Sequence, residues 1–246
     1  MNIIKTPTIM KQNPLIIAEF EKSFSEVDYD IVNILLHSLQ NELLLDGDTI
    51  DLFNYNKVLN RKVLIRASTF KNLGKFGKNA NKDIFNSLKK IRDTSIVIKN
   101  FIDIDGSLKK AMTVSLVDQV SWIDSGATLD NREQAFEIQF NEWFLKTSTK
   151  KFNIDVGHFT NLTLSDTVLL HGKHAKRLYE ILKAKEYRET TFSLKLDELQ
   201  KIFNLDDKPL AYINQMIKRI KPKIEELILF DYKVFKKDKI ISFIYL

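Results

Sequence analysis

One order of predicted elements occurs twice in this chain, and it constrains the fold more than any other feature of the sequence. Each copy reads helix, strand, short helix, turn, second helix, and then two β-rich runs around a polar tip. The first copy begins near residue 27 and the second near residue 166. Two helices joined by a turn and followed by a hairpin are the parts of a winged-helix domain. The sequence therefore predicts an α+β fold of two tandem winged-helix domains.

Apolar residues at helical spacing mark the start of the first copy. Val27, Ile31, Leu35 and Leu39 fall on one side of a helix, as expected for a buried face. The elements expected in this copy are a helix over 27–45, a strand over 49–53, a short helix over 69–75, a second helix over 79–93, and two strands around a turn at 103–106. That turn contains Asp-Gly, which between two β-rich runs indicates a hairpin.

The second copy repeats the order with different residues. Its expected elements are a helix over 166–187, a strand over 192–196, a short helix over 197–203, a turn over 204–209, a helix over 210–229, and strands over 232–235 and 240–245. Pro222 falls inside the last helix, where proline removes a backbone hydrogen bond. Because apolar spacing continues to Ile224 and Leu227, we expect a kink there rather than a helix end.

An acidic segment, residues 111–149, separates the two copies. It contains an expected strand over 136–140 and an amphipathic stretch at 143–145. We expect the domain boundary near 148–155. This gives an N-terminal winged-helix domain over residues 1–150, for dimerisation and DNA binding, and a C-terminal winged-helix DNA-binding domain over residues 151–246.

The charge of the chain is unevenly distributed. The formal net charge is +6, yet residues 54–110 hold fourteen Lys and Arg against four Asp, and residues 150–246 hold nineteen basic residues against thirteen acidic ones. The remaining segments are acidic. Two basic blocks attract a polyanion more strongly than the mean charge indicates, although solvated lysines alone produce the same composition.

The second helix of each copy has a polar face suited to DNA. In the first copy that face consists of Asn79, Lys82, Asn86, Lys89 and Lys90, and in the second of Asn214, Gln215, Lys218 and Arg219 with Tyr212 beside them. Amide side chains bond adenine edges, and Lys or Arg meets guanine or phosphate. A polar face on any single helix is ordinarily only solvated. Its recurrence at the same position of both copies favours binding in the major groove, which admits one helix.

Lysines also mark both expected hairpins. They are Lys109 and Lys110 in the first copy, and Lys236, Lys237 and Lys239 in the second. We expect them to contact phosphates beside the groove, which position a protein without reading sequence.

The stretch Leu170-His171-Gly172-Lys173-His174-Ala175-Lys176-Arg177-Leu178-Tyr179-Glu180-Ile181-Leu182 resembles the start of the second winged helix in the iteron-binding plasmid replication initiators. Residues 192–203 resemble that family's next strand and helix, residues 212–227 its recognition helix, and residues 11–16 its opening segment. The match is looser over 100–150. It implies that Lys173, Lys176 and Arg177 contact DNA. Gly172 and His174 stand where the family usually has Ser and small residues, which is a departure from the pattern.

The resemblance implies a cytoplasmic initiator that binds direct repeats at a plasmid origin. Its two winged helices are expected to enter successive major grooves on one face of the duplex. Monomers then help to melt adjacent AT-rich DNA and recruit the host initiator and replicative helicase. Dimers, in equilibrium with monomers, bind an inverted-repeat operator and repress the protein's own gene.

Other classes fit the sequence less well. A tandem winged-helix repressor without an initiator role shares every feature described above. The segment His174-Ala175-Lys176-Arg177 resembles the His-x-x-Arg box of tyrosine recombinases, but the nearest nucleophile candidate, Tyr212, borders the expected recognition helix. We therefore expect no enzymatic activity.

No cofactor, metal or membrane partner is expected. The chain has no Cys, which removes thiol nucleophiles and Cys-based metal sites. It also has no nucleotide-binding Gly-x-x-x-x-Gly-Lys-Ser/Thr motif and no His-Glu-x-x-His motif. Its apolar runs are far shorter than the ~18 residues of a membrane span.

Overall fold

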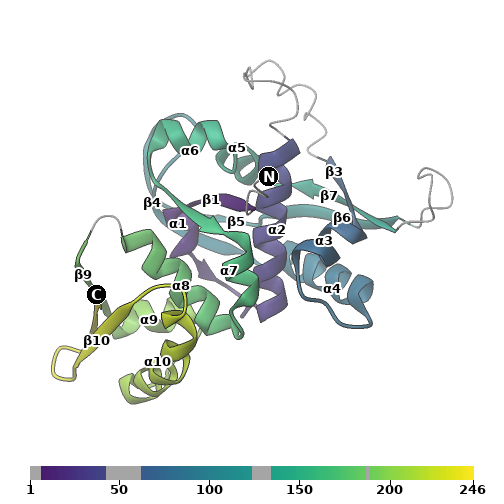
Figure 1. Ribbon diagram of the computed structural model, residues 1–246. Helices are drawn as coiled ribbons and strands as arrows, with labels where there is room; N and C mark the ends of the chain where they lie inside the picture. Colours follow the sequence, from purple (N-terminus) through teal and green to yellow (C-terminus); the bar gives the residue numbers. More distant parts are fainter. Residues whose placement is uncertain (1–6, 43–61, 124–133, 187–188) are drawn as a thin grey trace, which may run out of the picture.

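The structure is a computed structural model that describes residues 7–42, 62–123, 134–186 and 189–246 (Figure 1). The strand expected over 49–53, and the last residues of the helix expected over 27–45, lie outside the described residues. The elements of the first half are β1 (Thr8–Gln12), α1 (Asn13–Ile16), β2 (Glu19–Phe20), α2 (Glu26–Glu42), β3 (Lys62–Arg66), α3 (Ala67–Leu73), α4 (Ala80–Arg92), β4 (Ile96–Ile102), β5 (Leu108–Val114), β6 (Val117–Ile123), β7 (Ala135–Phe140), α5 (Glu142–Thr147) and α6 (Lys150–Val156). Those of the second half are β8 (Phe159–Thr163), α7 (Leu164–Leu169), α8 (Lys173–Glu186), β9 (Thr191–Lys195), α9 (Leu196–Phe203), α10 (Leu210–Glu225), β10 (Phe230–Phe235) and β11 (Ile240–Tyr245).

The described strands form four small antiparallel sheets. Their strand orders are β1-β8, β2-β4-β5, β3-β7-β6 and β10-β11-β9. The hairpins β4–β5 and β10–β11 are the two expected wings. Each follows the second helix of a helix-turn-helix pair, α3–α4 or α9–α10.

Helix α2 is the centre of the first module (Figure 1). Its apolar stripe, which includes Ile31, Ile34 and Leu35, is fully buried, and the helix contacts α4, β1, α7 and α8. Helix α4 buries Ile84 and Leu88 against this core. Because consecutive residues of a helix are rotated by about 100°, burial of that side turns the opposite side of α4 to solvent.

The second module follows the same plan around α10. This helix buries Ile213, Ile217, Ile220 and Ile224. It continues past Pro222 to Glu225, and Pro222 itself lies on the exposed side. The apolar stripe on both sides of the proline therefore holds the helix together although Pro222 has no N–H to donate.

The prediction of a single helix over 166–187 is wrong. The structure has two helices, α7 and α8, separated by Leu170–Gly172. Gly172 has a φ of +100°, a backbone region that is strained for residues with a side chain. The helix expected over 210–229 likewise ends at Glu225, and the N–H groups of Leu227 and Ile228 turn back to the carbonyl of Ile224.

Strand pairing crosses the segment where we expected the domain boundary. Strand β8, after that segment, pairs along its whole length with β1 at the start of the described chain. Helix α7 contacts α2, and α8 contacts α1, α2 and also α10. The packing of the first module thus continues through α7, and α8 belongs to the contacts of both modules.

Candidate DNA interface

The outward face of α4 is polar and largely free. Lys82, Asn86 and Lys89 are exposed, as is Asn79 just before the helix. Lys90 is only half-exposed, because its ammonium group pairs with the buried Asp28 carboxylate on α2 at 2.7 Å. Four of the five residues expected on this face are therefore available to a ligand, while Lys90 also anchors α4 to α2.

The outward face of α10 has the predicted composition. Gln215, Lys218 and Arg219 are exposed, and Tyr212 is 43% exposed. A surface hollow of about 250 Å³ lies among Tyr212, Gln215, Met216 and Arg219. Asn214 is half-buried, and its Oδ1 accepts a hydrogen bond from the hydroxyl of Tyr232 on β10 at 3.0 Å.

Cationic side chains connect these two faces. Burial lowers the pKa of Lys173, at the start of α8, and the charge of Lys90 on α4 adds to the effect. Burial also lowers the pKa of His174 to about 4, with further contributions from Lys173 and from Arg219 on α10. Charges from α4, α8 and α10 are therefore close enough to act on one another.

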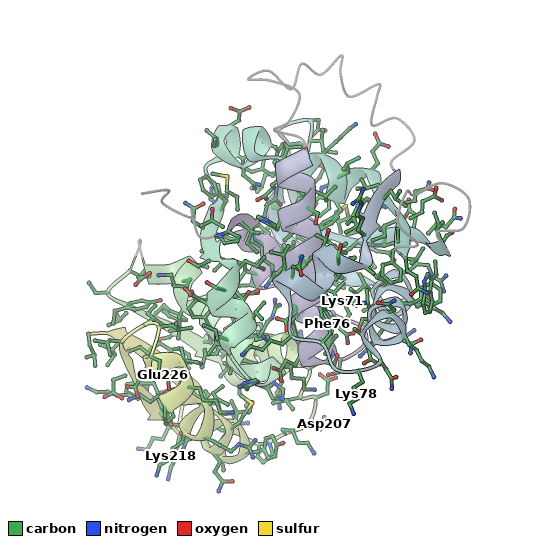
Figure 2. All side chains as sticks on the ribbon, turned by 45° about the vertical axis from the view of Figure 1, so that its right-hand side comes forward. Lys71, Phe76, Lys78, Asp207, Lys218 and Glu226 are labelled. Carbon is green, nitrogen blue, oxygen red and sulfur yellow. The ribbon has the colours of Figure 1, made fainter. Side chains whose placement is uncertain are left out.

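The two helices lie in different modules of the molecule. In Figure 1, α10 lies at the lower left of the molecule and α4 at its right, below β6. Figure 2, turned by 45°, shows Lys78, just before α4, and Lys218, on α10, in the lower part of the molecule. Exposed lysines on two helices suit an extended polyanion.

Both wings carry exposed lysines. Lys109 and Lys110 are exposed on β5, with Lys109 4.0 Å from Asp105. Lys236, Lys237 and Lys239 are exposed at the tip between β10 and β11. A larger hollow, of about 560 Å³, lies between this second wing and the start of α10.

Two of the expected DNA contacts are corrected by the structure. Lys176 and Arg177 are 0% and 1% exposed. The ammonium group of Lys176 pairs with Asp30 at 2.7 Å and donates to the carbonyl of Thr167. The guanidinium of Arg177 donates to the carbonyl of Ala18. Because these cations are used inside the protein, neither is available to DNA, whereas Lys173 stays at the surface and donates to Ser23.

Lys223 adds a further exposed cation to α10 that was not among the expected DNA contacts. This exposed residue of α10 donates to the carbonyl of His171, between α7 and α8, at 3.4 Å. It lies four residues after Arg219, so it belongs to the same helix face. That spacing was a usable signal.

Neither a metal-binding cluster nor a membrane-spanning helix occurs among the described residues. Over 7–42, 62–123, 134–186 and 189–246, no three His, Asp or Glu side chains gather in a way that suits a metal ion. Within those same ranges, each helix is too short or too polar to cross a bilayer.

Two solved structures have a fold similar to that of this chain. The chain resembles the crystal structure of the Pi initiator protein in complex with iteron DNA, with a TM-score of 0.56 and 13% identity over 98% of this chain and 97% of that one. It also resembles domains 2 and 3 of RctB, with a TM-score of 0.52 and 11% identity over 89% and 82% of the two chains. A search of curated protein sequences found no match.

These structural similarities confirm the tandem winged-helix fold. The family model described as Initiator Replication protein, WH1, matches residues 8–183, well over half of the chain. The protein therefore belongs to the initiator replication protein family.

Proposed function

We propose that this protein initiates plasmid replication by binding direct repeats of double-stranded DNA at the origin. The observation that carries the proposal is that α4 and α10, the second helices of the two helix-turn-helix pairs, have exposed faces of Lys, Arg, Asn and Gln side chains. The complex of the similarly folded Pi initiator with iteron DNA supports it. Each helix enters one major groove, and the two grooves are successive.

Contacts between the modules keep the two helices at a fixed spacing. Asn204, at the end of α9, donates from Nδ2 to the carbonyl of Phe20 on β2 at 2.8 Å. Lys223 on α10 donates a hydrogen bond to the carbonyl of His171.

We place the boundary between the modules after α8 instead of near residue 150, because β8, α7 and α8 all pack on the first module. A second contact made by an already bound protein is intramolecular, which raises the apparent affinity.

Fixed spacing has a consequence for the DNA. Fitting two grooves onto one rigid protein bends the duplex at an elastic cost of about 1–6 kcal/mol. We propose that this strain assists the opening of an adjacent AT-rich stretch. The proposal extends to dimers that bind an inverted-repeat operator and repress the gene, and to recruitment of the host initiator and replicative helicase by bound monomers in the cytoplasm.

A recombinase is disfavoured by the site itself. His174 and Arg177 of the His-x-x-Arg segment would have to face the same phosphodiester. Arg177 is buried and donates to the carbonyl of Ala18. A repressor without an initiator role uses the same DNA contacts, so the two functions differ only in whether bound protein starts replication.

Binding is expected to depend steeply on salt. If about six to ten of the exposed Lys and Arg neutralise phosphates, the slope of log K against log salt is between about −5 and −9. Fluorescence anisotropy with duplexes that carry the direct repeats flanking the gene measures this slope. A slope near zero, or equal affinity for repeat and scrambled duplexes, contradicts the proposal.

The initiator role is tested with a minimal plasmid. The gene and its flanking repeats are placed on a plasmid without another origin, and transformants are counted. The initiator replicates this plasmid, and deleting the repeats abolishes replication. Permanganate footprinting of the bound origin should then detect unpaired thymines in the AT-rich tract. A protein that binds the repeats without supporting replication is a repressor.

A further inference from the structure

The 560 Å³ hollow between α10 and the second wing has a mixed chemical lining. Asn214, Gln215, Lys236 and Lys239 supply its polar part, and its apolar part includes Leu210 and Val234. Two lysines and two amides line the hollow, and none of the described residues that line it is acidic. This lining suits a negatively charged group attached to a ring with apolar C–H groups, which describes a phosphate and its deoxyribose.

The hydrogen bond from Tyr232 determines what Asn214 offers to the hollow. The hydroxyl of Tyr232 donates to Oδ1 of Asn214 at 3.0 Å, and this bond joins the wing to α10. This bond uses one of the two lone pairs of Oδ1 and fixes the plane of the amide, whose N–H₂ group only donates. An Asn that reads adenine uses its oxygen and nitrogen together, one accepting and one donating. A phosphate oxygen needs only donors.

We propose that the hollow is a phosphodiester-binding subsite in which Tyr232 holds Asn214 as a donor to a backbone phosphate, with Lys236 and Lys239 supplying the countercharge. This inference rests on the proposed DNA binding and deepens it. Asn214 thereby positions the protein on the duplex. Sequence is read by other residues of α10, which lie further along its exposed face.

Three variants isolate the parts of this subsite. Tyr232→Phe removes only the hydroxyl that orients the amide. Asn214→Ala removes the amide and introduces a residue that favours helix, and circular dichroism checks that the variant is folded. Lys236→Gln removes one countercharge, and its matched control is Lys233→Gln, an exposed lysine of the same hairpin that does not line the hollow.

The probes are a duplex selected from a random pool by the full-length protein and a scrambled duplex of the same composition. Asn214→Ala should weaken binding about tenfold to 150-fold on both probes, the size of one hydrogen bond to a charged group. Tyr232→Phe should weaken both about twofold to fivefold, since the amide remains but is no longer fixed. Lys236→Gln should weaken binding to both probes, whereas Lys233→Gln should weaken binding to neither probe. A loss by Asn214→Ala on the selected duplex alone makes Asn214 a base reader and overturns the inference.

A neutral phosphate analogue locates the contact. Methylphosphonate is placed at one backbone position of the selected duplex at a time. At one position the substitution should weaken binding by the wild type, but it should not weaken binding by Asn214→Ala any further. If no position couples to Asn214 in this way, the subsite is disproved. If the wild type itself fails to prefer the selected duplex, it is the proposed function that fails.

Discussion

Replacing Glu180 by alanine is expected to lower the free energy of unfolding by about 3–5 kcal/mol, because it leaves a buried ammonium group without its partner charge. Glu180 on α8 is fully buried, and both of its carboxylate oxygens lie 2.8 Å from Nζ of Lys11 on β1. Asn33 on α2 completes the cluster, bonding Lys11 at 3.1 Å and Glu180 at 3.1 Å. Burial lowers the pKa of Lys11, and the charge of Glu180 opposes that shift.

The double variant Lys11→Met/Glu180→Leu is the control. Replacing a whole buried ion pair by apolar residues of similar size is often neutral or stabilising, so the double variant should be much more stable than Glu180→Ala. Urea unfolding at pH 7 measures all three free energies. We expect the cluster to hold α8 against β1 and α2, and a cost below about 1 kcal/mol for Glu180→Ala contradicts that role.

Arg219→Ala is expected to weaken binding to repeat DNA by about 1–3 kcal/mol, or about fivefold to 150-fold. Arg219 is exposed on α10 beside Gln215 and Lys218, and its guanidinium is able to bond two acceptors of one guanine. Titration of repeat and random duplexes at one salt concentration measures the effect. The loss should be confined largely to the repeat duplex.

Arg219→Lys separates a base contact from a phosphate contact. Lysine keeps the charge but lacks the planar fork that bonds guanine at two points. If Arg219 reads guanine, Arg219→Lys should lose most of the preference for the repeats. Equal losses of Arg219→Ala on repeat and random duplexes, restored by lysine, would make Arg219 a phosphate contact.

The helices that support these predictions follow from local sequence. Helices α2, α4 and α10 were expected from apolar spacing, because each buries one continuous stripe. Both wings were expected from β-rich runs around polar tips, and both form antiparallel hairpins. The exposed residues of α4 and α10 follow from the same spacing, since the side opposite a buried stripe faces solvent.

What the sequence did not predict depends on contacts between distant segments. Lys176 and Arg177 read as surface cations because their partners, Asp30 and Ala18, are 146 and 159 residues away along the chain. The pairing of β8 with β1 joins the two ends of the first module in the same way. The break between α7 and α8 had a local sign in Gly172, but a glycine in a helical pattern does not by itself end a helix.

The central claim is that α4 and α10 enter successive major grooves on one face of the duplex. Because the chain has no Cys, the variants Asn86→Cys on α4 and Gln215→Cys on α10 each accept a single tethered iron chelate that cleaves nearby DNA. On the selected duplex, the account predicts two cleavage centres about 10 base pairs apart on the same face. Cleavage by both variants at the same base pairs, or by only one of them, would contradict it.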